Sequence, residues 1–184
     1  MTIDIGECAA DPGRHETIQI PSPPGMLVLR AERTADQDFR FQLFCDSRLP
    51  EWYAVALDPA VRKQLMRHQF QAQTMTYRQR FPRARFDIIE LDAERIGRIV
   101  VNRPGTMVHI VDHAIVPALR NRGIGTAIMR ALMDEAQQAH VPVRLKVASS
   151  NDPSMKLYLR LGFMPIETVP AYIEMEWPPP VGMP

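Results

Sequence analysis

His109–Ala127 reads HIVDHAIVPALRNRGIGTA, and this stretch decides the fold. Its first part, up to Val116, is rich in β-branched residues and predicts a strand. A turn follows, and Gly123 and Gly125 lead directly into a helix expected over Gly123–His140, where apolar residues recur at helical spacing. The stretch therefore predicts a strand, a glycine-containing loop and a helix start in immediate succession.

The start of this helix has the pattern of an anion site. A first helical turn has amides without intrahelical acceptors and lies at the positive end of the helix dipole. Glycines let those amides approach an anion closely. From His113 to Met133 the chain has three arginines (Arg120, Arg122 and Arg130) and no acidic side chain. We therefore expect a phosphate or pyrophosphate here, although the same glycines would also suit a tight turn with close packing.

Two common nucleotide-binding motifs do not fit this loop. A P-loop needs a lysine after its second glycine, but Gly125 is followed by Thr126 and Ala127. A dinucleotide fingerprint needs a third glycine or alanine where Ile128 stands, and it opens a chain rather than lying late in it.

The remaining pattern predicts an α+β (mixed α/β) domain. Asp58 and Pro59 form a helix start, Thr34 and Gln37 resemble a capping box, and Asp92-Ala93 predicts a hairpin turn. The strands are expected over Met26–Ala31, Arg85–Leu91, Arg95–Asn102, Thr106–Val116, Val141–Ala148, Phe163–Ile166 and Ala171–Trp177. The helices are expected over Thr34–Cys45, Asp58–Arg80, Gly123–His140 and Pro153–Leu161, the last capped by Asn151 or Asp152.

Length and proline content indicate the domain limits. A chain of 184 residues with 46% hydrophobic residues suits one domain with a single core. Many of the 17 prolines lie near the two ends, and dense proline disfavours helix and sheet interiors. We therefore expect a flexible arm over residues 1–24, one domain over residues 25–177 and a tail over residues 178–184.

The composition disfavours several functional classes. A net charge of +1 argues against a nucleic-acid partner, and no apolar run approaches the roughly 20 residues needed to span a membrane. Met1–Gly13 has no apolar signal core, and Cys8 and Cys45 are too few for a disulfide framework. We expect a cytoplasmic protein without a metal ion; the oligomeric state stays open, with a homodimer as one option.

Two sequence blocks resemble the GCN5-related N-acetyltransferase (GNAT) family. That family has an Arg/Gln-x-x-Gly-x-Gly/Ala loop between a strand and a helix, which Arg120–Gly125 matches fully. It also has an Asn, a Tyr seven residues later and then Gly-Phe, which Asn151, Tyr158 and Gly162-Phe163 match. By element order the resemblance extends over residues 26–177. It implies a central, mostly antiparallel sheet with splayed strands, flanked by about four helices.

The resemblance further implies acetyl-CoA as acyl donor and an amine as acceptor. The CoA pyrophosphate would bind the loop amides, and the pantetheine arm would add to the edge of the strand at Ile115 and Val116. Tyr158 would donate a proton to the leaving thiolate. The implied CoA-binding residues are Ile115, Val116, Arg120, Arg122, Gly123, Ile124, Gly125, Thr126, Asn151 and Tyr158.

The group that deprotonates the amine is less certain. Several family members use a carboxylate near the start of the strand, where ungapped alignment here places His109. His109 and His113 share one face of a regular strand, and histidine has a suitable unperturbed pKa. Asp112 falls on the opposite face unless a bulge resets the alternation. His109, His113 and a water chain therefore stay open as routes for the proton.

The acceptor site is expected between the early helices and the splayed strands. Gln69, Gln73 and Tyr77 share one helical face with Thr76 and are candidates for substrate binding, although such a polar stripe is often solvated. Trp52 and Tyr53 would line the same cleft or anchor a loop. The main alternative to an enzyme is a non-catalytic CoA-binding sensor or assembly module of the same fold, and another acyl-CoA donor is also open.

Overall fold

The computed structural model describes residues 16–53 and 58–178. The first half of the chain forms β1 (Ile18–Ser22), β2 (Gly25–Ala31), the 3₁₀ helix η1 (Thr34–Asp36), α1 (Gln37–Tyr53), α2 (Pro59–Arg80), β3 (Arg85–Leu91) and β4 (Glu94–Asn102). The second half forms β5 (Val108–Ile115), the 3₁₀ helix η2 (Pro117–Leu119), α3 (Ile124–Gln138), β6 (Val143–Ala148), α4 (Asp152–Arg160), β7 (Met164–Val169) and β8 (Tyr172–Trp177).

The strands form one sheet in the order β1-β2-β3-β4-β5-β6-β8-β7. Among the described strands, β5 and β6 are the one parallel pair, and all other neighbours are antiparallel. This arrangement confirms the predicted mixed, mostly antiparallel sheet. The β3–β4 hairpin turns at Asp92 and Ala93, whose φ angles of 52° and 64° suit the tight turn predicted there.

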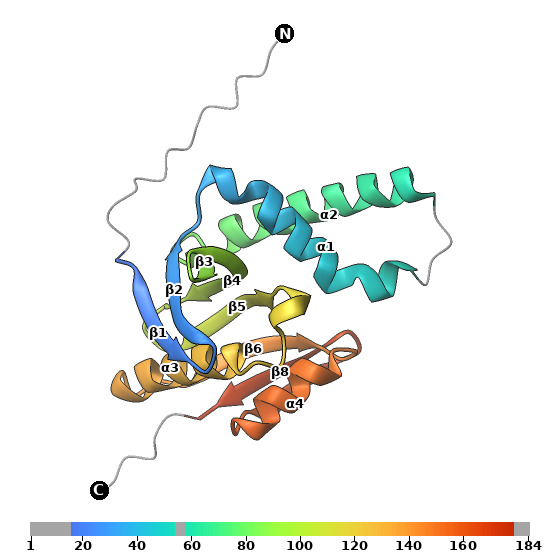
Figure 1. Cartoon of the computed structure of the whole chain (residues 1–184). Coiled ribbons are helices and arrows are strands. Elements are labelled where there is room, and N and C mark those ends of the chain that lie inside the picture. Colours follow the sequence, from blue (N-terminus) through green and yellow to red (C-terminus); the bar gives the residue numbers. More distant parts are fainter. Residues whose placement is uncertain (1–15, 54–57, 179–184) are drawn as a thin grey trace, which may run out of the picture.

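The helices lie on opposite faces of this sheet, with α1 and α2 together on one side and α3 and α4 on the other (Figure 1). Phe41 and Phe44 of α1 meet the ring of Phe70 in α2 at centroid distances of 5.5 and 5.6 Å. On the opposite face, the apolar side of α3 packs on the sheet through Ile128, Met129 and other fully buried side chains. Each such residue contributes about 1.5–3 kcal/mol through burial.

The start of the chain differs from the prediction, because residues 18–22 of the expected arm form β1 and pair with β2. Proline density suggested an unstructured segment, but β1 is an edge strand, where Pro21 needs no amide donor for a further neighbour. Ser22 closes the hairpin by donating to the carbonyl of Gly25 at 2.6 Å. Residues 1–15, and the expected tail beyond Pro178, lie outside the described residues.

The helix starts were predicted with mixed success. Asp58 caps α2 as expected, since its carboxylate accepts the amides of Ala60 and Val61 at 2.8 and 3.3 Å. The capping box at Thr34 is wrong, because Thr34 lies inside η1. Instead, the Asp36 carboxylate accepts the amide of Arg33 at 2.8 Å, and α1 continues to Tyr53.

Candidate active site

The glycine loop connects the end of β5 to the start of α3. Gly123, the N-cap of α3, has a φ of +82°, a left-handed conformation that favours glycine. No side chain of the described residues caps α3, so the amides of its first turn remain available as donors. Arg120 Nε donates to the carbonyl of Ile115 at 3.0 Å and thereby ties the loop to the end of β5.

A β-bulge changes the faces of β5. Val101 of β4 pairs with Ile110, and Val100 pairs with Asp112, so Val111 is an extra residue without a partner. His109 and Asp112 consequently share the face covered by α1 and α2. His113 lies on the other face, where its Cε1 is 3.5 Å from the position that a Cβ on Gly125 would take. The expectation that the two histidines share a face is therefore wrong, because the bulge resets the alternation.

Strands β5 and β6 separate after a short paired segment. They pair at Val108, His109 and Ile110, whereas β6 pairs with β8 along its whole length. Val116 donates its amide to Ile96 at 2.9 Å and accepts the amide of Leu119 at 3.1 Å. Since amides alternate along a strand, the amide of Ile115 points away from β4, into the side where β6 has separated. Among the described strands the Ile115 amide therefore has no partner, whereas its carbonyl accepts Arg120 Nε and both backbone groups of Val116 have partners.

Tyr158 lies on α4 and is 7% exposed, packed against Phe163 at a ring distance of 5.7 Å. Burial, with a smaller contribution from the charge of Asp112, raises the pKa of Tyr158 to about 12. The phenol is therefore protonated at neutral pH, as a proton donor must be. Asn151 caps α4 through its side-chain oxygen, which accepts the amide of Ser154 at 3.3 Å, as the sequence predicted.

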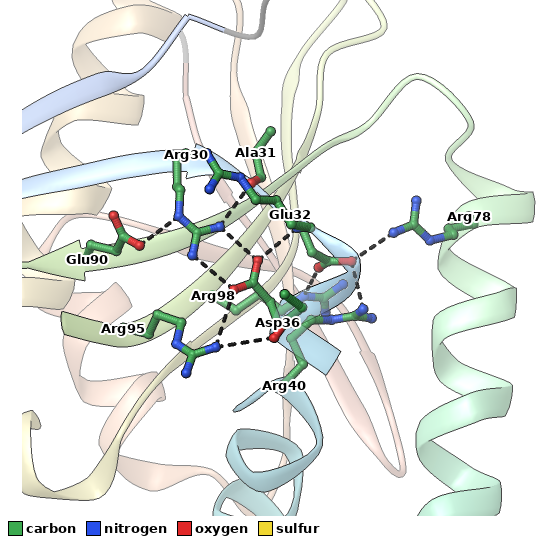
Figure 2. A network of polar contacts seen from close by, with 11 residues as sticks. Arg30, Ala31, Glu32, Asp36, Arg40, Arg78, Glu90, Arg95 and Arg98 are labelled. Carbon is green, nitrogen blue, oxygen red and sulfur yellow. Dashed lines mark hydrogen bonds and ion pairs between the residues drawn. The ribbon is translucent and has the colours of Figure 1, made fainter. Parts of the chain in front are cut away.

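Asp112 belongs to a buried network of charged residues. Arg98 donates to Asp112 Oδ2 at 2.8 Å through Nη1 and to Glu32 Oε2 at 3.0 Å through Nε. The side chain of Glu32 is 2% exposed and also forms ion pairs with Arg40 and Arg78, as Figure 2 shows. Burial raises the pKa of Asp112, and Arg98 opposes that effect.

A second cluster stands beside this network. Asp36 accepts hydrogen bonds from both terminal nitrogens of Arg30, at 2.8 and 2.9 Å, and also contacts Arg95 (Figure 2). Arg30 in turn donates to Glu90 at 2.7 Å. The two clusters tie η1, α1 and α2 to the middle strands, and so they fix the helices that cover Asp112.

A small pocket of about 70 Å³ lies between α1, α2 and the Asp112 face of the sheet. Of the three predicted substrate residues, Gln73 lines it, and Gln73 Nε2 donates to the hydroxyl of Tyr77 at 3.2 Å. Burial, with the charge of Asp112, raises the pKa of Tyr77 to about 12. Gln69 is exposed and does not line the pocket, and the side chains of Trp52 and Tyr53 lie outside the described part. The lining residues are Arg40, Leu43, Phe44, Ser47, Arg48, Phe70, Gln73, Arg98, Asp112 and Ala114.

The two histidines have different surroundings. His109 is half-buried, with its ring 5.2 Å from that of Phe81, and burial lowers its pKa below the usual value. His113 is held neutral, because burial lowers its pKa to about 4, and its Nε2 has no hydrogen-bond partner among the described residues. Neither histidine lines the pocket that contains Asp112.

Sequence reasoning missed the arginines that line this pocket and Glu32, which pairs with two of them. Glu32 follows the apolar strand β2, and Arg98 interrupts a run of buried residues in β4. A buried charge requires a partner, so Arg98 within an apolar strand was a usable signal. The choice of Asp112 as that partner depends on the bulge at Val111 and could not be read from alternation.

A mixed sheet that splays beside a glycine-containing helix start is the architecture of an acetyltransferase domain. The chain matches the acetyltransferase (GNAT) family over residues 41–163 and belongs to that family. A curated N-alpha-acetyltransferase from Sulfurisphaera tokodaii is 31% identical over an alignment of 103 residues, and the match covers 48% of this chain and 62% of that relative. The aligned part thus spans less than two thirds of the relative's length.

Several solved structures share the fold. PaiA N-acetyltransferase from Thermoplasma acidophilum, in complex with coenzyme A, has a TM-score of 0.61 and 17% identity, covering 82% of this chain and 97% of that one. Ard1 from Thermoplasma volcanium has a TM-score of 0.58 and 19% identity, covering 82% and 96%. RimJ from Mycobacterium smegmatis, in complex with CoA-disulfide, has a TM-score of 0.56 and 19% identity, covering 88% and 86%.

Two kinds of feature are absent from residues 16–53 and 58–178. No group of three or more His, Cys, Asp or Glu side chains is arranged there to hold a metal ion. No helix in these ranges combines the length and apolar character needed to cross a membrane.

Proposed function

We propose that the protein is an acetyl-CoA-dependent N-acetyltransferase that moves the acetyl group to an amine by direct attack. The observation that carries the proposal is the separation of β5 from β6 beside the start of α3, together with the buried phenol of Tyr158 on α4. This arrangement supplies a slot for an acyl-CoA arm, donors for its phosphates and a proton donor.

Acetyl-CoA would bind by two kinds of backbone contact. The amides of Gly123, Gly125 and Thr126 are donors for the pyrophosphate at the positive end of the α3 dipole. Ile115 offers its amide to the pantetheine arm, which adds to the free edge of β5 as a strand would. Arg120 supports both contacts by holding the loop against the Ile115 carbonyl.

The chemistry needs a nucleophilic amine and a protonated leaving group. The amine nitrogen forms a bond to the acetyl carbon, and the carbon–sulfur bond then breaks. Tyr158, which is protonated at neutral pH, donates its phenolic proton to the departing sulfur, and the phenolate regains a proton from solvent before the next turnover. Such a donor contributes about 10²–10⁴-fold to the rate.

We assign the proton lost by the amine to Asp112, with His109 as the alternative at the position that the family often uses. Asp112 supports this assignment because it lines the acceptor pocket and its pKa is raised. His109 shares the face of Asp112 but precedes the separation of β5 and β6. His113 is the weakest of the three, since it faces α3. Asp112→Asn is expected to remove the acidic limb of the kcat/KM pH profile, and His109→Asn to leave it in place.

The deciding experiment measures free CoA released from acetyl-CoA in the presence of a panel of amines, beside calorimetric binding of acetyl-CoA. Tyr158→Phe is expected to lower kcat about 10²–10⁴-fold and to leave acetyl-CoA affinity within about threefold. Tyr172→Phe, on the exposed hairpin of β7 and β8, is the matched control. Equal losses of binding and turnover would contradict the proton-donor role. Tight binding without CoA release by any amine would favour a non-catalytic sensor.

A further inference from the structure

The pocket beside Asp112 has a chemical character of its own. Three arginines line it, Arg40 and Arg48 from α1 and Arg98 from β4, together with the aromatic rings of Phe44 and Phe70. Its volume of about 70 Å³ is several times the roughly 10–15 Å³ that one water requires, so a carboxylate-sized group fits.

Two buried guanidinium groups of this pocket each have one N–H donor without a hydrogen-bond partner among the described residues. Arg98 is 6% exposed and uses Nε and Nη1 for Glu32 and Asp112, but its Nη2 has no hydrogen-bond partner among the described residues. Arg40 is 8% exposed and uses Nη1 for Glu32 and Nη2 for Thr74, while its Nε has none in the same ranges. Buried charged donors without acceptors are costly and rare.

The charges around the pocket do not balance. Arg40, Arg48 and Arg98 line it and Arg78 reaches its carboxylate Glu32, whereas the acids are Glu32 and Asp112. Among the described residues, the pocket and the Glu32 network beside it thus hold four arginines and two carboxylates, and Asp36 of the neighbouring cluster also acts on Arg40. Burial and the neighbouring Arg98 and Arg78 lower the pKa of Arg40 to about 10, although Glu32 opposes this. An anion in the pocket would relieve that repulsion.

From these observations we infer that the acceptor carries a carboxylate, which binds the free donors of Arg40 and Arg98 while its amine lies at Asp112. The inference rests on the proposed acetyltransferase function and names the acceptor class. The carboxylate can be that of a free amino acid or an acidic side chain at the N-terminus of a peptide. Polyamines are disfavoured, because additional positive charges would meet the four arginines.

Arg48 makes this inference testable without unfolding the protein. Its guanidinium lies 4.7 Å from the centre of the Phe44 ring, and it forms no ion pair with any described residue, so its removal leaves no carboxylate unpaired in the described part of the chain. Arg40→Lys is the second variant, since it keeps the positive charge beside Glu32 but removes the free Nε donor. Lys63→Gln, on the exposed face of α2, is the matched control.

The first measurement is binding of propionate and of propionamide, an isosteric pair without an amine, at constant ionic strength. Both are titrated into the full chain while the ¹H–¹⁵N resonance of Arg40 Nε, assigned by its loss in Arg40→Lys, is followed by NMR. We expect a saturable shift with propionate and about tenfold weaker or no binding of propionamide. Equal responses to both compounds would overturn the inference.

The second measurement is CoA release with two acceptor pairs, alanine against alaninamide and Asp-Ala-amide against Asn-Ala-amide, which distinguish the two sources of the carboxylate. In at least one pair we expect kcat/KM to be about tenfold or more higher for the acid, and Arg48→Gln to reduce that preference while Lys63→Gln does not. Turnover without any carboxylate preference would overturn the inference and leave the transferase intact. Propionate binding without CoA release from any acceptor would instead refute the proposed function and leave the anion pocket standing.

Discussion

Gly123 and Gly125 lie two residues apart in the loop, yet the structure predicts opposite responses to alanine. Gly123 has a φ of +82°, and a Cβ there would lie 2.8 Å from Cγ of Pro23, in the turn between β1 and β2. Gly125 lies in the first turn of α3, where the nearest atoms to a Cβ are on Leu157 and His113, at 3.4 and 3.5 Å. The first position is strained and blocked, whereas the second has room for a methyl group.

These contacts set the magnitudes. A left-handed alanine costs about 1–2 kcal/mol, and displacing Pro23 adds to that. Gly123→Ala is therefore expected to destabilise the protein by about 2 kcal/mol. Gly125→Ala is expected to stabilise it by up to about 1 kcal/mol, the difference in helix propensity. For a chain of this length, 1 kcal/mol corresponds to a change in Tm of about 2–4 °C.

The assay is thermal unfolding followed by circular dichroism, with acetyl-CoA affinity measured by calorimetry. We expect Gly123→Ala to lower Tm and weaken acetyl-CoA binding, because the N-cap and the adjacent amides shift together. Adding Pro23→Ala should recover the part of the lost stability that the clash with Pro23 causes. It should not recover the part caused by the left-handed backbone conformation at position 123. A Gly123→Ala protein as stable as Gly125→Ala would refute this account of the loop.

Two further predictions concern pH. Arg30 holds the pKa of Asp36 at about 2, below its usual 3.8, so Asp36→Asn should lower the free energy of unfolding by about 2 kcal/mol at pH 7. This contribution disappears as the pH falls from about 4 to 2. Urea unfolding should therefore give a smaller difference between the wild type and the variant at pH 3 than at pH 7. Burial lowers the pKa of His113 to about 4 from 6.5, so the unfolded chain binds a proton more readily than the folded one, and stability should fall as the pH drops from 6.5 to 4. If His113→Gln left the slope of the free energy of unfolding against pH unchanged in this range, the prediction would be contradicted.

Much of the fold could be predicted because the strongest signals in the sequence are local. Asp58 with Pro59 marks the start of α2, Asp92-Ala93 marks a hairpin, and the glycines mark the entry to α3; each is satisfied by contacts a few residues away. β1 was missed because proline was interpreted by density rather than by position. An edge strand tolerates Pro21, and only the complete sheet reveals which strand is at the edge.

The candidate site was less predictable, because it depends on contacts between distant segments. Glu32 and Arg98 are 66 positions apart, and neither has a local motif that announces the other. An acceptor side near α2 stays a prediction; Gln73 lines the pocket, but helical spacing alone did not separate Gln73 from the exposed Gln69. The assignment of Asp112 to the pocket required knowledge of one unpaired residue in β5.

That residue, Val111, also affects how the length of β5 can change during evolution. In a regular strand, a single-codon deletion moves all the residues on one side of it to the opposite face, but at a bulge it removes only the extra residue. Loss of Val111 would remove the bulge and leave Ile110 opposite Val101 and Asp112 opposite Val100, so Asp112 would stay on the face of the arginine pocket and His113 on the other face. The bulge is thus a place where β5 can lose one residue without exchanging the side chains of its two faces.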